Sequence, residues 1–198
     1  MTRRDKRKAE NRGKLLAAAR RVFAEKGVAR ATARDIVRAT DLASGTFYNY
    51  FDDKDDAFRA VMEEFTTQAR AAAREQRLKA GVEIEERLYR AYLAYFELVV
   101  ADPEMFEILR RNADAIAMMG TDDLFETAVQ ELAEDMGQWV ERGELPAGVV
   151  EWLPYIGRTI AGGGFQVAAQ LAETENPDIE AAARFCGRLL LDGLRGLG

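Results

Sequence analysis

The sequence predicts an all-helical protein of about nine helices, in which a small N-terminal helix-turn-helix domain precedes a larger helical domain. Apolar residues recur at helical spacing, and no segment shows the alternating pattern of a half-buried strand. Only four prolines occur among 198 residues. Ala, Leu, Glu and Arg, which have high helix propensity, are abundant. A chain of this length can bury a substantial core.

The first helix is expected over residues 8–26. Its apolar residues form one stripe, made of Leu15, Leu16, Ala19, Val22 and Phe23. Gly27 is a typical C-terminal stop. Thr32 followed by Asp35 is a capping-box pattern, which predicts that the second helix begins there.

A short third helix is expected over residues 44–50, with Phe47 and Phe51 on its buried side. Asp53 is placed to cap a fourth helix that continues to about residue 76. The acidic run over 52–56 lacks the spacing and the glycine of a calcium loop, so capping is favoured over a metal site. No metal or cofactor is expected anywhere in the chain.

The remaining five helices are expected over residues 83–100, 103–119, 122–142, 149–173 and 177–197. Pro103 suits the first position of a helix. Three successive glycines at 162–164 are costly inside a helix. They indicate a kink or close helix packing, or alternatively a break in the helix.

Charge is distributed unevenly along the chain. Residues 1–50 contain thirteen Lys or Arg against five Asp or Glu, whereas residues 51–198 contain fifteen against twenty-nine. A basic N-terminal part on an acidic body is typical of a nucleic-acid-binding module joined to a domain of another function.

Several classes of protein are excluded by composition. The chain has no histidine, which removes Ser-His-Asp and Cys-His catalysis and most zinc sites, so we do not expect an enzyme. The single cysteine, Cys186, cannot form an internal disulfide and fits a reducing compartment. No apolar run is long enough to span a bilayer, and no signal peptide is present, so a cytoplasmic protein is expected.

Residues 30–59 carry the most specific pattern in the chain. Two short helices are separated by a tight connection at 40–43, and the second carries small and hydrogen-bonding residues, as in a helix-turn-helix that enters a DNA major groove. The pattern consists of Thr32, Ile36, Gly45-Thr46-Phe47-Tyr48, Tyr50-Phe51 and Lys54 at this spacing. By these residues the chain resembles, over about residues 14–60, the N-terminal domain of the TetR family of bacterial transcriptional regulators.

The resemblance implies which residues contact DNA. Bases would be contacted by Ser44, Gly45, Thr46 and Asn49 of the third helix and by Arg34 of the second, whereas Thr32, Tyr48, Tyr50 and Lys54 would contact phosphates. For Arg34 an ordinary solvated charge is an equal alternative. Asp41 stands where the family often has Gly, and Ala43 stands where Ser or Thr commonly caps the third helix. The cap is therefore expected from Asp41 or Ser44.

The C-terminal region is rich in aromatic residues and Met, which line adaptable cavities between helices. Most of them belong to the core, but we expect some to form an effector pocket. The candidates are Tyr92, Phe96, Met105, Phe106, Arg110, Met118, Phe125, Trp139, Phe165 and Gln166.

The resemblance also implies a homodimer through the last two helices, which are dense in small residues. We expect residues 1–53 to form the DNA-binding domain and residues 54–198 the effector-binding and dimerisation domain. The predicted function is a repressor that binds a palindromic, double-stranded operator and is released by a small, largely apolar effector. A helical ligand-binding protein without DNA activity is the alternative.

Overall fold

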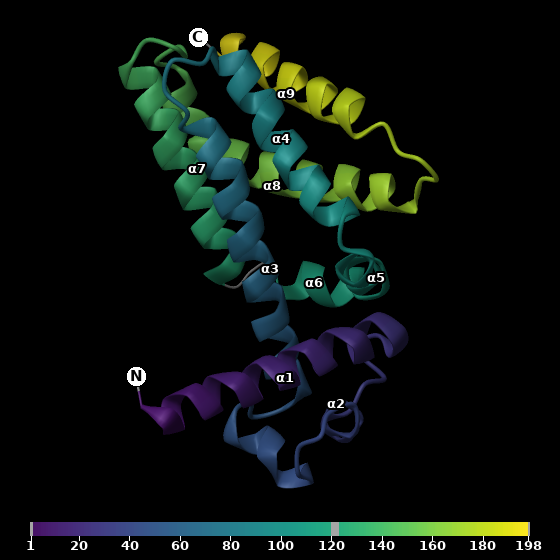
Figure 1. The fold of residues 1–198 in the computed structure, drawn as a ribbon. Coiled ribbons are helices and arrows are strands. Elements are labelled where there is room, and N and C mark those ends of the chain that lie inside the picture. The colour runs from purple at the N-terminus through teal and green to yellow at the C-terminus, as the bar shows by residue number, and fades with distance from the viewer. Residues whose placement is uncertain (1, 120–122, 198) are drawn as a thin grey trace. The chain divides into compact units, whose positions relative to one another are not determined.

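The computed structural model describes residues 2–119 and 123–197, with the backbone alone for Ser44, 117–119 and 123–125. These residues form nine α-helices and one 3-10 helix, and they contain no strand, so the predicted all-helical class is confirmed. The elements are α1 (Arg3–Lys26), α2 (Ala33–Arg38), η1 (Ser44–Asn49), α3 (Lys54–Arg77), α4 (Ile84–Val100), α5 (Pro103–Arg111), α6 (Ala113–Met119), α7 (Asp123–Glu141), α8 (Val149–Glu173) and α9 (Ile179–Arg195) (Figure 1).

The chain divides into two compact units. Unit 1 contains residues 1–66 and 103–116, and unit 2 contains residues 67–102 and 117–198. Helices α3 and α6 therefore each contribute residues to both units. The expected division into functional domains at residues 53 and 54 stays a prediction.

The core of unit 1 is built on the apolar stripe of α1. The Phe23 ring is fully buried and meets the Phe58 ring of α3 edge to face, with the centroids 5.2 Å apart. Ile36 of α2 and Phe47 of η1 are also fully buried. Their burial helps to hold the helix-turn-helix in unit 1, because an apolar side chain of this size gains about 1.5–3 kcal/mol from full burial.

A buried hydrogen-bond network holds the loop after α1. Gly27 ends the helix with φ of +73°, a conformation that favours glycine. The Val28 amide donates to Asn112 Oδ1 at 2.6 Å, and the Val28 carbonyl accepts from Lys54 Nζ at 2.9 Å. Asn112 is only 4% exposed and also donates to the Ile108 carbonyl at 2.7 Å. Both backbone groups of Val28 are thus satisfied by distant side chains.

Unit 2 is a helical bundle in which α4 runs beside α8 and α9, and α7 packs on α8 (Figure 1). Trp139 of α7 is fully buried and belongs to one apolar cluster with Leu88, Val149 and Leu191. Glycine allows two close approaches. A Cβ on Gly187 would lie 3.0 Å from the Tyr89 amide nitrogen, and one on Gly157 would lie 2.9 Å from Val129 Cγ1.

A buried ion cluster joins α3 to α7 within unit 2. Asp135 is fully buried and accepts from Arg77 Nε at 2.9 Å and from Arg74 Nε at 3.1 Å. Burial lowers the pKa of Arg77, and the charge of Asp135 opposes that shift. Removing one partner of such a cluster leaves an uncompensated buried charge, which is strongly destabilising.

Several local predictions are confirmed. Thr32 and Asp35 form the capping box of α2. Asp53 Oδ1 accepts from the amides of Asp55 and Asp56, each at 2.8 Å, and so caps α3. Helix α8 continues without a break through Gly162–Gly164, which excludes the alternative of two separate helices.

Three predictions are wrong in detail. Helix α1 begins at Arg3 rather than at residue 8, because Thr2 and Asp5 form a capping box that the sequence reading missed. The predicted third helix is a 3-10 helix. The predicted helix over 103–119 is interrupted at Asn112, where the side chain bonds outside the helix to the Val28 amide.

We predict that Asn112→Ala destabilises unit 1 because it leaves the Val28 amide buried without an acceptor. The free energy of unfolding, measured by urea denaturation, should fall by about 1–3 kcal/mol. The Val28 amide proton should also exchange faster with solvent. The control is Glu64→Ala at an exposed position of α3, which should change the free energy by less than about 0.5 kcal/mol. Equal effects of the two substitutions would contradict the proposed role of Asn112.

Candidate nucleic-acid interface and apolar surfaces

The short helix η1 is oriented by one buried side chain. Phe47 is fully buried, and its ring centroid lies 5.5 Å from that of Phe51 and 5.4 Å from that of Tyr48. A segment of six residues with its central aromatic ring in the core cannot turn about its axis without losing that burial. The burial of Phe47 therefore fixes which residues of η1 face outward.

The outward residues of η1 are those that the sequence analysis assigned to DNA. Tyr48 is 65% exposed, and Asn49 is exposed beside it. A Cβ built on Gly45 would meet nothing within 4 Å, so a partner surface can approach the backbone there. Thr46 is half-buried, and the side chain of Ser44 lies outside the described residues. Small and polar groups thus gather on one exposed surface.

The turn before η1 is held by Thr40 and Asp41. Ala43 stands at the N-cap of η1 and makes no side-chain cap hydrogen bond, and the side chain of Ser44, one of the two expected caps, lies outside the described residues. The Thr40 hydroxyl instead accepts from the Leu42 amide at 3.2 Å and donates to the Val37 carbonyl at 2.8 Å. Asp41 does not have a positive φ and pairs with Lys14 of α1 at 2.8 Å.

At the start of α2, Thr32 is committed to the helix cap. Its hydroxyl accepts from the Asp35 amide at 3.1 Å and donates to the Asp35 carboxylate at 2.7 Å. The Lys26 ammonium, 2.7 Å from the carboxylate, and then the Thr32 hydroxyl lower the pKa of Asp35 to about 2. Arg34 is exposed and forms no ion pair with any described residue, which leaves its guanidinium available.

Two further predicted phosphate contacts lie near the end of η1. Tyr50 is half-buried. Lys54 donates to the Val28 carbonyl and, at 3.0 Å, to Asp55 Oδ1. Lys54 therefore has a place in the fold of unit 1, and a contact between its ammonium and a phosphate stays a prediction.

The effector-pocket candidates are distributed over both units. Met105, Phe106 and Arg110 belong to unit 1, whereas Tyr92, Phe96, Trp139, Phe165 and Gln166 belong to unit 2. The side chains of Met118 and Phe125 lie outside the described residues. Two candidates are brought together, because the Tyr92 and Phe96 rings of α4 lie 5.7 Å apart.

The other candidates have varied surroundings. Trp139 is fully buried with the Arg87 guanidinium 5.3 Å from its ring centroid, and Met105 is fully buried. Phe106 and Phe165 are half-buried and Gln166 is exposed. Arg110 is exposed and pairs with Glu107 at 2.8 Å. The effector pocket stays a prediction.

Tyr95 was not among the predicted pocket residues, although its ring lies beside two of them. Its ring lies 5.7 Å from that of Phe96, and a Cβ on Gly164 of α8 would lie 3.8 Å from Tyr95 Cε1 and 3.6 Å from Tyr92 Cε1. Burial raises the pKa of both tyrosines. Tyr95 follows Tyr92 by three residues on the same helix, so its spacing was the available signal.

Unit 2 exposes an apolar groove on α8 and α9. The groove has a volume of about 490 Å³ and is lined almost wholly by apolar side chains. Six of the eight exposed large hydrophobic side chains among the described residues lie on these helices or directly after α9. They are Val150, Trp152, Tyr155, Phe185, Leu189 and Leu197. Soluble monomers rarely expose a contiguous apolar surface of this kind.

Comparison with known proteins identifies the N-terminal segment. Residues 15–61 match the model of the family described as bacterial regulatory proteins, tetR family. The N-terminal domain belongs to the TetR family. The matched segment covers the buried half of α1, α2, η1 and the start of α3. No curated protein matches the chain in sequence.

Solved structures extend the similarity over the whole chain. A TetR-family transcriptional regulator from Pectobacterium atrosepticum is 26% identical, with a TM-score of 0.70, over 100% of this chain and 97% of its own. The fatty acid degradation regulator FadR from Bacillus halodurans is 23% identical, with a TM-score of 0.78, over 93% and 96%. FadR from Bacillus subtilis, solved in complex with stearoyl-CoA, is 20% identical, with a TM-score of 0.75, over 91% and 97%. Both units therefore have the fold of TetR-family regulators.

No helix among the described residues is long and apolar enough to cross a membrane.

Proposed function

We propose that this TetR-family chain is a transcriptional repressor that inserts η1 into the major groove of a palindromic operator. The observation that carries the proposal is the exposure of Gly45, Tyr48 and Asn49 around the buried Phe47. A regulator of this kind acts in the cytoplasm, where the DNA is, and works by binding rather than by catalysis.

The chemistry of the η1 surface fits both kinds of DNA contact. Asn49 can form two hydrogen bonds with an adenine edge, and Thr46 can meet a thymine methyl. Gly45 allows the backbone to approach the groove, and Ser44 stands beside it in the sequence. The Tyr48 hydroxyl can donate a hydrogen bond to a phosphate, which positions the protein on DNA of any base sequence.

Residues outside η1 complete the proposed interface. Arg34 can bind a guanine edge through two parallel hydrogen bonds, since its guanidinium has no ion-pair partner among the described residues. Tyr50 and Lys54 can bind phosphates near the end of η1. Thr32 can do so only where its hydroxyl exchanges its hydrogen bond to the Asp35 carboxylate for one to a phosphate. Lys54 bonds to Val28 and Asp55, so its phosphate contact would have to use the remaining N–H.

A palindromic operator requires two copies of η1, and the apolar groove on α8 and α9 supports a homodimer through these helices. Leu189 and Phe185 of α9 are each 63% exposed, and a Cβ on Gly162 or Gly163 of α8 would meet nothing within 4 Å. Small residues beside exposed large ones allow helices of a second copy to pack closely. The same surface of an identical chain would cover this groove and have its own groove covered, so that both apolar surfaces leave water.

A small, largely apolar effector is proposed to release the repressor from its operator. FadR from Bacillus subtilis has been solved with stearoyl-CoA, which shows that one protein of this fold accepts a ligand with a long apolar part. In this chain the proposed contact for such a ligand is the aromatic cluster of Tyr92, Tyr95 and Phe96 on α4, which the ligand would have to open because Phe96 is fully buried. To release DNA, the effector must bind the conformation that cannot hold the operator several kcal/mol more tightly than the conformation that can.

We predict that Tyr48→Phe and Asn49→Ala weaken operator binding in different ways. Loss of the Tyr48 hydroxyl should reduce affinity about tenfold for every operator sequence, because a phosphate is the same at each position. Loss of the Asn49 amide should mainly relax the preference for one base pair, by about 1–3 kcal/mol. Fluorescence anisotropy with a panel of single-base operator variants measures both effects. Uniform weakening by Asn49→Ala would exclude base reading by that residue.

We predict that Leu189→Glu separates the dimer, because it places a charge in the apolar groove. Light scattering after size-exclusion chromatography should give a monomer, and operator affinity should fall about 100-fold or more, since the second half-site is then no longer tethered. Gln138→Glu, at an exposed position of α7 outside the groove, is the control with the same added charge and should remain dimeric. A dimeric Leu189→Glu variant would contradict the assignment of this face.

A further inference from the structure

The first twelve residues of α1 form a basic helical segment that lies outside the apolar core. Residues 2–14 contain seven Lys or Arg against Asp5 and Glu10. The buried residues of α1 begin only at Leu15, and every residue from Arg3 to Lys14 is exposed except the half-buried Asn11. The segment also precedes residues 15–61, which match the family model. Apart from the contacts of Arg12 with Phe51 and of Lys14 with Asp41, core packing therefore gives this half of α1 no role.

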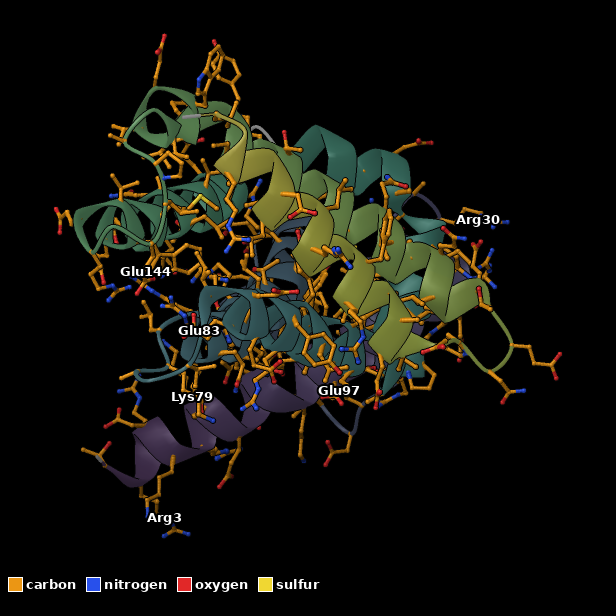
Figure 2. The ribbon with its side chains drawn as sticks, turned by 90° about the horizontal axis from the view of Figure 1, so that it is seen from above. Arg3, Arg30, Lys79, Glu83, Glu97 and Glu144 are labelled. Carbon is orange, nitrogen blue, oxygen red and sulfur yellow. The ribbon has the colours of Figure 1, made fainter. Side chains whose placement is uncertain are left out.

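The segment is nevertheless structured as a helix. The Thr2 hydroxyl accepts from the Asp5 amide at 3.2 Å, and the Asp5 carboxylate accepts from the Thr2 amide at 2.8 Å. This capping box satisfies the first turn and also neutralises part of the helix dipole with the Asp5 charge. Figure 2 shows the Arg3 side chain projecting away from this end of α1. A capped helix presents its charges in a fixed arrangement, which a disordered tail would not.

The basic residues are not placed evenly around the helix. Arg4, Lys8 and Arg12 follow one another at intervals of four, and the same stripe continues as Leu15, Ala19 and Val22. The face of α1 that packs on the core in its second half is therefore a basic face in its first half. Arg3 and Lys6 lie on the opposite side of the helix, by the same geometry.

One contact shows where the basic face points. The Arg12 guanidinium lies 5.6 Å from the centroid of the ring of Phe51, the second residue after η1. Phe51 follows Tyr50, one of the proposed phosphate contacts. Within unit 1, the N-terminal turns of α1 extend past the helix-turn-helix (Figure 1). Lys8 and Arg4 thus continue outward along the side of α1 that carries η1, at steps of about 6 Å along the axis.

We propose that Arg4 and Lys8 bind backbone phosphates of the DNA that flanks each half-site. The basic charge of the segment complements the polyanionic duplex, and the stripe starts where the η1 surface ends. These contacts add affinity without reading bases, so they extend the bound site beyond the sequence recognised by η1. The inference rests on the proposed function, since it needs η1 to bring the duplex alongside unit 1.

The test compares two double variants of the full-length protein. Arg4→Gln with Lys8→Gln removes the basic face, and Arg3→Gln with Lys6→Gln removes the same charge from the opposite side. Gln keeps the helix, since its propensity is close to those of Arg and Lys. Arg12 is left unchanged because it covers Phe51. The probe is a duplex selected by the wild-type protein from a random pool, with about one helical turn of flanking DNA on each side.

The Arg4/Lys8 variant should bind this duplex at least about tenfold more weakly than the Arg3/Lys6 variant. The slope of log affinity against log salt concentration should be smaller in magnitude than that of the wild type by about 3–4, since four phosphate contacts per dimer are lost. Its ranking of operator sequences should be unchanged. Trimming the flanks from the duplex should reduce the wild-type slope to that of the Arg4/Lys8 variant.

Three results would overturn this inference and leave the proposed function standing. Equal salt slopes for the two double variants would show that only the net charge of the segment matters and not its position on the helix. A wild-type slope that is the same with and without flanking DNA would contradict the proposed contact. Loss of binding to anionic lipid vesicles by the Arg4/Lys8 variant, with operator binding intact, would assign the face to a membrane surface instead. Failure of the wild-type protein to select any sequence would refute the proposed function itself.

Discussion

The complete burial of Phe47 is the constraint on which the candidate interface depends. A six-residue 3-10 helix has too few internal hydrogen bonds to hold its own orientation, so the surrounding core must supply it. With the ring of Phe47 inside, Gly45, Tyr48 and Asn49 can only lie outside. The groups that would meet DNA are therefore positioned by an apolar contact, and their own chemistry stays free for a partner.

The frame around this contact is held by side chains from distant parts of the chain. Lys54 and Asn112 satisfy the two backbone groups of Val28, and Lys14 of α1 reaches Asp41 in the turn. The surface pair contributes little by itself, whereas the buried amide would be costly to leave unpaired. Asn112 follows α5 in the chain, so the order of the loop after α1 depends on a residue more than eighty positions away.

Features of the fold that depend on neighbouring residues could be predicted from the sequence, whereas features that depend on contacts between distant residues could not. Thr32 with Asp35, Asp53 and Gly27 were predicted correctly because a cap or a stop is decided by neighbouring residues. The interruption at Asn112, whose side chain accepts from the distant Val28 amide, was not predictable from neighbouring residues. For the same reason the sequence predicted a phosphate contact for Lys54 but not its hydrogen bond to the Val28 carbonyl. Which aromatic residues of α4 face α8 likewise depends on packing around Gly164.

The central claim is that two copies of η1 read the major groove at a fixed separation. Selection of duplexes from a random pool by the wild-type protein, followed by methylation interference at guanine N7, tests it most directly. The account predicts an inverted repeat whose half-site centres lie about one helical turn apart, roughly 34–36 Å, with interference confined to the major groove of each half-site. An unsplit, non-palindromic site, or binding that methylation of the major groove does not affect, would contradict it.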